Sequence, residues 1–396
     1  MFKQNRNLLI IGLIALVNML GYGIIIPIMY EYSKKFGLTD FQNGLLFAIF
    51  SICQFISTPI IGRLSDKYGR RPMLLISIIG TALSFFVMAF APSAIFLFIA
   101  RALDGLTAGN IPVIFAVISD STKPEERAKA FGLVSAAFNF GFIFGPVTAA
   151  FTVGLGVAMP FIIAGIITVI AAVLTGIYLP ETNKNLSDSS VKHGKLIDFK
   201  QLWHTLFDPN VGMTFLISLI FFLAFSAAII YGYQPFTANI LKITTSQNSM
   251  LWTMFGVIGL ISQTFLVGRI SKALGMKKAF TTSILLTFVS FILMYFSRSL
   301  PLFILASIIL GVFNNVVQTL IPTILSNEAD AKSQGSIMGL NASYQSIGMI
   351  VGPILGGVVA TISIPLPFLV GAGLILVCYF LSFQILKPGI KKESAF

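Results

Sequence analysis

The sequence GRLSDKYG at residues 62–69 recurs as GRISKALG at residues 268–275, an offset of 206 positions. A second pair agrees, because GFIFGPVTAA begins at Gly141 and GMIVGPILGG begins at Gly348, an offset of 207. The first pair follows the second apolar stretch of each half, and the second pair lies in the fifth. This internal repeat predicts a chain built from two copies of one unit.

The composition around these motifs is strongly apolar. Hydrophobic residues make up 56% of the 396 residues and charged residues 10%, with 38 phenylalanines and a mean hydropathy of +0.92. Soluble domains carry about 25% charged residues, because charge must cover their surface. The composition therefore excludes a water-soluble enzyme, a disordered chain and a coiled coil, and it indicates an integral membrane protein.

Twelve apolar stretches meet the requirement for crossing a bilayer core, which is about 20 residues of helix. They run approximately over residues 8–30, 43–61, 73–91, 95–118, 130–154, 158–179, 211–234, 249–267, 279–296, 301–325, 336–360 and 366–386. Runs this long differ from the alternating pattern of barrel strands. The predicted fold is an all-α integral membrane protein, with twelve transmembrane helices in two six-helix, pseudo-symmetric halves.

The boundaries of the halves follow from one polar segment. Residues 181–210 form the only long polar stretch, and we expect them to be a cytoplasmic linker between an N-terminal half at residues 1–180 and a C-terminal half at residues 211–396. Within the linker, residues 196–207 fit either a short interfacial helix or a flexible segment. We expect the protein to be a monomer.

The basic residues predict the orientation. If the N-terminus is cytoplasmic, 21 of the 26 Lys and Arg residues fall in inner segments, four in outer segments, and Arg101 inside a span. The positive-inside rule then places both termini in the cytoplasm of a multi-pass protein of the plasma (inner) membrane. The net charge of +12 is explained by this topology, so we expect no nucleic-acid partner.

Cysteine and histidine give no sign of a metal or a disulfide framework. Cys53 and Cys378 lie in apolar stretches of opposite halves, and the two histidines, His193 and His204, lie in the linker. Neither pattern has metal-ligand spacing. No phosphate-binding Gly-Lys-Ser/Thr loop is present either, so we expect no metal, no cofactor, no ATP hydrolysis and no enzyme activity.

Three motifs together carry a resemblance that covers the whole chain. They are Gly62–Arg71 (GRLSDKYGRR) after the second span, Arg101–Gly105 (RALDG) in the fourth, and Gly141 with Gly145-Pro146 in the fifth. In these motifs the chain resembles the twelve-helix drug:proton antiporters of the major facilitator superfamily, and among them the tetracycline exporters. The two six-helix halves fit the arrangement of that superfamily.

The resemblance implies roles for two of the motifs. It implies a conformational latch formed by Gly62, Asp66, Gly69, Arg70, Arg71, Asp120 and Arg127, in which Arg70 reaches toward Asp120. The Asp66 carboxylate would dock on the positive N-terminus of the eleventh span, near residues 333–336, a contact of about 0.3–2 kcal/mol. Alternatively, these charges only follow the positive-inside rule.

The antiporter motif of Gly141, Gly145 and Pro146 implies a kink and tight packing, although Ala149 and Ala150 replace the glycines that its pattern prefers.

Arg101 and Asp104 are the only charges that we place deep in the hydrocarbon region, where each costs several kcal/mol without a partner. Three residues apart on one helix, they can interact. We predict that Asp104 carries the coupling proton as its contact with Arg101 changes, and a permanent structural ion pair is the alternative.

Many relatives have an acid in the first span, whereas here Asn18 occupies that depth and Glu31 lies only at the outer end. Glu31 is therefore a second candidate for proton coupling.

Polar and aromatic residues inside the spans are candidates for a central substrate cavity, because polar groups are costly in lipid. They are Asn18, Tyr22, Asn110, Asn139, Tyr231, Gln234, Asn314, Gln318, Asn341, Tyr344 and Gln345. Hydrogen bonding inside the bundle is the alternative role for each. A site with few charges and many aromatic rings favours a large, mainly apolar ligand.

The function implied by these features is proton-coupled export of hydrophobic or amphipathic drugs by alternating access. The partners would be a small-molecule substrate, protons and the lipid bilayer. A transporter of a sugar, another metabolite or a lipid on the same fold is the first alternative, because fold does not determine cargo. A membrane sensor that transports nothing is the second, and the internal repeat disfavours it.

Overall fold

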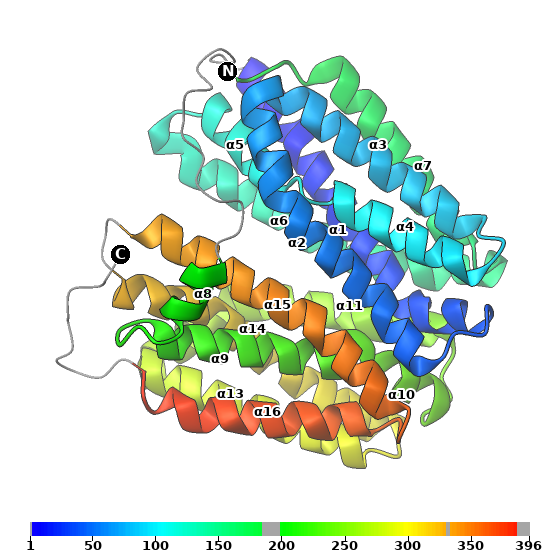
Figure 1. Cartoon of the computed structure of the whole chain (residues 1–396), viewed down its shortest axis with the longest axis vertical. Coiled ribbons are helices and arrows are strands. Elements are labelled where there is room, and N and C mark those ends of the chain that lie inside the picture. The colour runs from blue at the N-terminus through cyan, green and yellow to red at the C-terminus, as the bar shows by residue number, and fades with distance from the viewer. Residues whose placement is uncertain (1, 184–198, 330–332, 386–396) are drawn as a thin grey trace. The chain divides into compact units, whose positions relative to one another are not determined.

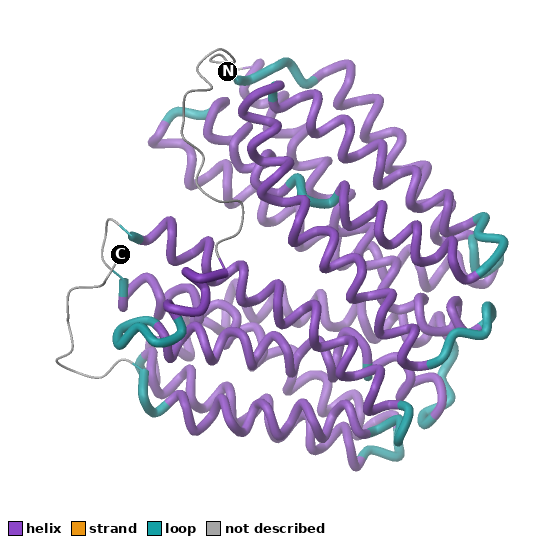
Figure 2. The backbone as a smooth tube through the Cα atoms, viewed as in Figure 1, coloured by secondary structure: helices purple, strands orange, loops and turns teal. Residues whose placement is uncertain are grey.

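The computed structural model describes residues 2–183, 199–329 and 333–385, and all regular structure in these ranges is helical (Figure 2). Eleven helical segments of the described residues, some of them made of two or three consecutive elements, are long and apolar enough to cross a membrane, and α16 (Leu366–Ser382) is a twelfth apolar helix of 17 residues. The predicted fold class is confirmed. Of the segment at residues 196–207, the part before residue 199 lies outside the described residues.

The chain divides into two compact units. One consists of Met1–Leu38, Ile49–Ile197 and Thr244–Gly256, and the other consists of Thr39–Ala48, Asp198–Ile243 and Val257–Phe396. The division of the chain into halves at residues 1–180 and 211–396 stays a prediction.

The helices of the N-terminal part follow one another through short turns. They are α1 (Phe2–Lys34), α2 (Asp40–Tyr68), α3 (Arg70–Ala89), α4 (Ala94–Thr107), α5 (Ile111–Ser121), α6 (Pro124–Thr152), the short η1 (Val153–Leu155) and α7 (Met159–Tyr178). Figure 1 shows α3 beside α7, and α1 packs along both α6 and α7. Ile14, Leu74, Val117 and Val134 belong to a buried core that joins α1, α3, α5 and α6.

The fourth span is broken in its interior. Its helices α4 and α5 form one apolar segment, Ala94–Ser121, but α4 ends at Thr107 and α5 begins at Ile111. Pro112 has no N–H group and therefore cannot bond the carbonyl of Ala108, four residues earlier. Non-helical backbone inside a membrane protein is tolerated only where other groups satisfy it. The break is thus a place where the surrounding side chains must contribute.

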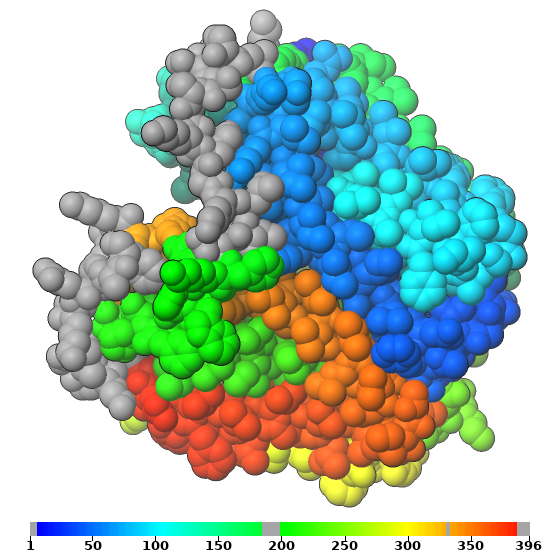
Figure 3. Space-filling view, in the orientation of Figure 1, coloured from blue at the N-terminus to red at the C-terminus, as the bar shows by residue number. Residues whose placement is uncertain are grey.

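The helices of the C-terminal part include two π-helical turns. They are α8 (Phe199–Thr205), α9 (Gly212–Phe225), η2 (Ser226–Tyr231), α10 (Tyr233–Asn239), α11 (Thr245–Ile261), η3 (Ser262–Leu266), α12 (Val267–Leu274), α13 (Met276–Phe296), α14 (Leu300–Glu328), α15 (Gln334–Ala360) and α16. Figure 1 shows α13 beside α16, and the side chains of α15 and α16 form one continuous orange and red face in Figure 3.

The two copies of the repeated motif share an unusual backbone conformation. Gly69 ends the first copy with φ 105°, and Gly275 ends the second with φ 76°. Each glycine stands at the junction of two helices, α2 with α3 and α12 with α13. Residues with a side chain rarely adopt such angles. The repeat in the sequence is therefore also a repeat in local structure.

Candidate functional site

The charged pair of the fourth span is buried inside the first unit. Arg101 is 1% exposed and Asp104 6% exposed. The Arg101 guanidinium donates a hydrogen bond from Nη1 to Oδ2 of Asp104 at 2.9 Å. The same guanidinium lies over the ring of Phe50, 4.1 Å from its centre, and Tyr22 packs against that ring. The structure thus brings Arg101 and Asp104 together in a buried environment beside aromatic rings.

Two candidate cavity residues of this unit, Asn18 and Asn110, contact each other. The amide of Asn18 donates from Nδ2 to Oδ1 of Asn110 at 2.8 Å. Asn110 is fully buried at the start of α5, whereas Asn18 is only half-buried on α1. Tyr22 and Asn139 are also half-buried, on α1 and α6. Asn18 is therefore a partly accessible end of a buried polar contact.

Glu31 lies apart from these contacts, in the last turn of α1. Its Oε2 accepts a hydrogen bond from the hydroxyl of Thr245, the first residue of α11. The Glu31 side chain is half-buried.

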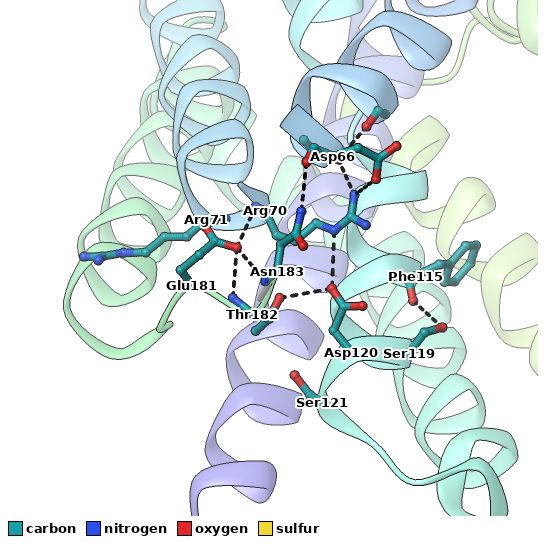
Figure 4. Close-up of polar contacts among 12 residues, drawn as sticks. Asp66, Arg70, Arg71, Phe115, Ser119, Asp120, Ser121, Glu181, Thr182 and Asn183 are labelled. Carbon is teal, nitrogen blue, oxygen red and sulfur yellow. Dashed lines mark hydrogen bonds and ion pairs between the residues drawn. The ribbon is translucent and has the colours of Figure 1, made fainter. Parts of the chain in front are cut away.

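The latch residues gather around the guanidinium of Arg70 (Figure 4). Its Nη1 lies 2.5 Å from Oδ1 of Asp66, and its Nε lies 3.3 Å from Oδ2 of Asp120. The Arg70 side chain thus joins the end of α2 to the end of α5. Asp66 is 51% exposed and Asp120 29% exposed, and exposed ion pairs contribute only about 0.2–1 kcal/mol each. Contacts of this strength can break and re-form at modest cost.

The remaining latch residues contact backbone rather than one another. Arg127 donates to the carbonyl of Ser119 at 3.3 Å, in the last turn of α5, and Arg71 donates to the carbonyl of Gly176. A cation at a helix C-terminus is favourable. A side chain at Gly62 would have only Pro112 within reach, at 4.0 Å. The docking of Asp66 on the eleventh span stays a prediction.

Glu181, which the sequence analysis assigned only to the linker, completes this cluster. Its carboxylate accepts the backbone N–H groups of Arg70 at 2.9 Å and Arg71 at 3.1 Å, the first two residues of α3. It also accepts the N–H groups of Thr182 and Asn183. The first N–H groups of a helix need such acceptors. Glu181 therefore caps α3 from 111 positions away in the sequence.

The sequence contains a signal for this distant cap. Gly69 occupies the N-cap position of α3 and has no side chain with which to accept a hydrogen bond. A side chain there would in any case collide with the Glu181 carboxylate. A helix that begins after glycine needs an acceptor from elsewhere, and an acid directly after the sixth span is a suitable candidate.

We expect Glu181→Ala to destabilise the start of α3 by about 0.5–2 kcal/mol, the usual effect of losing a cap. The measurement is hydrogen exchange of the first turn of α3, which should become faster in the variant. Glu181→Gln should have a smaller effect, because its amide oxygen can still accept. The control is Glu125→Ala, which removes the same charge from the exposed first turn of α6. Equal exchange in Glu181→Ala and the control would contradict the capping role.

The antiporter motif lies where α6 meets α1. A side chain at Gly141 would collide with the carbonyl oxygen of Leu16, and one at Gly145 would come within 2.5 Å of the carbonyl oxygen of Leu20. Pro146 lies inside α6, and its ring lies against Gly23. The two helices therefore approach through their backbones at these positions.

The candidate cavity residues of the second unit differ in their hydrogen bonding. Asn341 accepts a bond from Ser218 at 2.8 Å, and Tyr344 donates to the carbonyl of Leu202 in α8. Asn314 is 6% exposed, and its Oδ1 has no hydrogen-bond partner among the described residues. The others are Tyr231 and Gln234, which are buried, and Gln318 and Gln345, which are half-buried.

Comparison with known proteins identifies the family. The family model of the Major Facilitator Superfamily matches residues 11–236 and 215–395. The chain belongs to this superfamily. Its resemblance to drug exporters of the superfamily is confirmed: the chain is 31% identical over 379 residues to Multidrug resistance protein 2 of Bacillus subtilis, covering 91% of this chain and 92% of the relative.

Other members of the superfamily are similar over comparable lengths. The class B tetracycline resistance protein of Escherichia coli is 27% identical over 380 residues, covering 92% of this chain and 90% of that protein. Among solved structures, a bacterial homologue of the human lysosomal transporter Spinster, inward-facing and unoccupied, has a TM-score of 0.81 at 15% identity, covering 98% and 99% of the two chains. Membership of the superfamily makes this chain a multi-pass membrane protein with a transporter fold.

Proposed function

We propose that this chain exports hydrophobic or amphipathic drugs in exchange for protons. The single observation that carries the proposal is the buried Arg101–Asp104 pair in the broken fourth span. A buried carboxylate is stable either as a partner of the guanidinium or as a neutral acid. Two such states of one group provide a means to bind a proton on one side of the membrane and release it on the other.

The relatives support the drug as the exported substrate. Proteins named for multidrug, quinolone and tetracycline resistance are 26–31% identical to this chain over most of its length. Asn314 fits a role in substrate binding, because a buried amide oxygen without a partner costs about 1–3 kcal/mol and a ligand donor would satisfy it. We also propose a monomer in the inner membrane with both termini in the cytoplasm.

The test is transport by everted membrane vesicles that contain the chain. We expect a proton gradient to drive uptake of ethidium or tetracycline, and added drug to release protons that a pH-sensitive dye reports. Vesicles without the chain are the control. Drug uptake without proton movement would remove the coupling from the proposal. Uptake of sugars or lipids but of neither drug would overturn the export of drugs, and no uptake of any compound would favour a sensor.

A further inference from the structure

Side chains from two neighbouring spans satisfy the backbone at the break of the fourth span. The hydroxyl of Ser57 donates to the carbonyl of Gly105 at 3.1 Å, and the amide of Gln54 donates to the carbonyl of Ala108 at 3.4 Å, both from α2. From α3, the hydroxyl of Ser77 donates to the carbonyl of Thr107. A continuous helix would pair the carbonyls of Gly105 and Thr107 with its own N–H groups, whereas the carbonyl of Ala108 faces Pro112, which has no N–H group. The break is therefore part of the folded structure and not a frayed end.

Ser77 connects this break, through Asn110, to the half-buried amide of Asn18. Its hydroxyl accepts a hydrogen bond from Nδ2 of Asn110 at 2.7 Å, while Asn110 itself accepts from Asn18 at 2.8 Å. Ser77 is 1% exposed and Asn110 0% exposed. A continuous chain of hydrogen bonds thus runs from Asn18 on α1, through α5 and α3, to the backbone at the end of α4.

A second hydroxyl of α3 continues the path to the buried carboxylate. The hydroxyls of Thr81 and Thr107 lie 3.2 Å apart, and Thr107 also donates to the backbone carbonyls of Leu103 and Asp104. The Thr81 hydroxyl also lies near the Asp104 carboxylate and interacts favourably with its charge. Ser77 and Thr81 lie one helical turn apart on α3. Ser77 therefore contacts Asn110 and the broken backbone, and Thr81 lies beside Thr107 and Asp104.

We infer that Ser77 and Thr81 are positioning residues that couple drug binding beside Asn18 to proton binding at Asp104. The inference rests on the proposed function, because it requires both a drug and a proton. A drug that moves the Asn18 amide also moves Asn110, and the Ser77 hydroxyl must follow, since buried polar groups are costly to leave without partners. The movement of Ser77 then reaches the carbonyl of Thr107 at the break. Because the backbone hydrogen bonds of α4 do not continue into α5, the end of α4 can move there. The last turn of α4, with Thr107, can then shift Thr81 relative to the carboxylate.

Titratable groups from three helices of the described chain interact with the charged pair. Arg101 lies on the same helix as Asp104, Tyr22 lies on α1 and Cys53 lies on α2. On α3 the only charged residues are Arg70 and Arg71 in the first turn, at the latch. Phenols and thiols ordinarily titrate near about 10 and about 8.5. A comparison of drug binding at about pH 5.5 and about pH 7.5, below both values, therefore avoids their titration.

The experiment measures the Kd of ethidium for the purified full-length protein at these two pH values. The charge of ethidium does not change between them. Energetic coupling between two sites commonly changes affinity by a factor of about 5–150, and it is reciprocal. We expect the wild-type Kd to be at least about fivefold higher at the lower pH. Ser77→Ala and Thr81→Val should each bring the ratio of the two Kd values close to one.

Two further variants separate coupling from stability. Thr81→Ser keeps the hydroxyl and should restore the wild-type ratio. Thr168→Val removes an equally buried hydroxyl, which among the described residues bonds the carbonyl of Ala164 in its own helix α7, and should keep the ratio unchanged. If a residue had only a structural role, its replacement would lower the folded fraction and leave the ratio of the two Kd values unchanged. If Thr81→Val does not fold, Ser77→Ala decides, because it removes a single oxygen atom.

The outcomes distinguish the inference from the proposed function. A wild-type protein that fails to bind ethidium, or binds it equally at both pH values, contradicts drug:proton antiport itself. A wild-type ratio that persists in Ser77→Ala overturns the inference and leaves antiport standing. Loss of the ratio in Ser77→Ala, with its retention in Thr81→Ser and Thr168→Val, supports the coupling path.

Discussion

We expect Asp104→Asn to abolish drug-driven proton release. Asparagine has almost the same shape as aspartate but cannot bind a proton, so a carrier at this position loses its function completely. The same change leaves Arg101, which is 1% exposed, without its counter-charge. Removing one partner of a buried ion pair costs about 3–5 kcal/mol of stability. We therefore expect a protein that is less stable and that no longer releases protons when drug is added to everted vesicles.

A second variant separates these two effects. Replacing both members of a buried pair is often neutral for stability, so the double variant Arg101→Gln with Asp104→Asn should recover much of the lost thermal stability. It should not recover proton release. Glu125→Gln, on the exposed first turn of α6, is the matched control and should behave like the wild type.

Proton release that is undiminished in Asp104→Asn would remove Asp104 from the role of carrier. The Arg101–Asp104 pair would then be a structural ion pair. Glu31 would be the next group to replace, because it is a half-buried carboxylate held by the hydroxyl of Thr245.

We expect Gly141→Ala to destabilise the packing of α6 on α1. The added methyl group would collide with the carbonyl oxygen of Leu16, and also lie 2.9 Å from the side chain of Met19. A backbone carbonyl inside a helix cannot turn away as a flexible side chain can. Overpacking of this kind costs about 1–3 kcal/mol. We expect a lower thermal unfolding temperature in detergent and less drug transport for each folded molecule.

The same helix provides a matched control. Gly132 also lies in α6, and an added Cβ there would have nothing within 4 Å. Gly132→Ala should therefore keep the wild-type unfolding temperature or raise it, since alanine favours a helix over glycine by about 0.5–1 kcal/mol. If both variants unfold at the same temperature, close backbone packing at Gly141 is not important for stability.

The features that were predictable from the sequence depend on neighbouring residues along the chain. The predicted apolar stretches coincide with helical segments of the described residues, the fourth with the two helices α4 and α5, because hydropathy over about 20 residues decides whether a segment enters a bilayer. The Arg101–Asp104 contact follows from a spacing of three residues on one helix. Arg70 and Asp120 were expected to meet only through a resemblance, since 50 positions separate them. The roles of these residues in coupling and in the latch stay predictions.

Other features were not predictable because they arise between segments that are far apart. Pro112 is visible in the sequence, but the fourth stretch is continuously apolar, and hydropathy does not show that α4 ends at Thr107. The cap of α3 by Glu181 spans 111 positions. Ser77 and Thr81 are two small polar residues in an apolar helix, and such residues often bond only their own helix, as Thr168 does.

The sequence by itself determined the number of spans, the repeat and the class of protein, because each of these depends on local hydropathy or on motifs that can be compared directly. Only the tertiary structure decided which hydroxyl meets which carbonyl at the break, and which acid caps α3. A hydrogen bond depends on positions within a few tenths of an ångström. Those positions are set when several helices pack together, and no single segment contains that information.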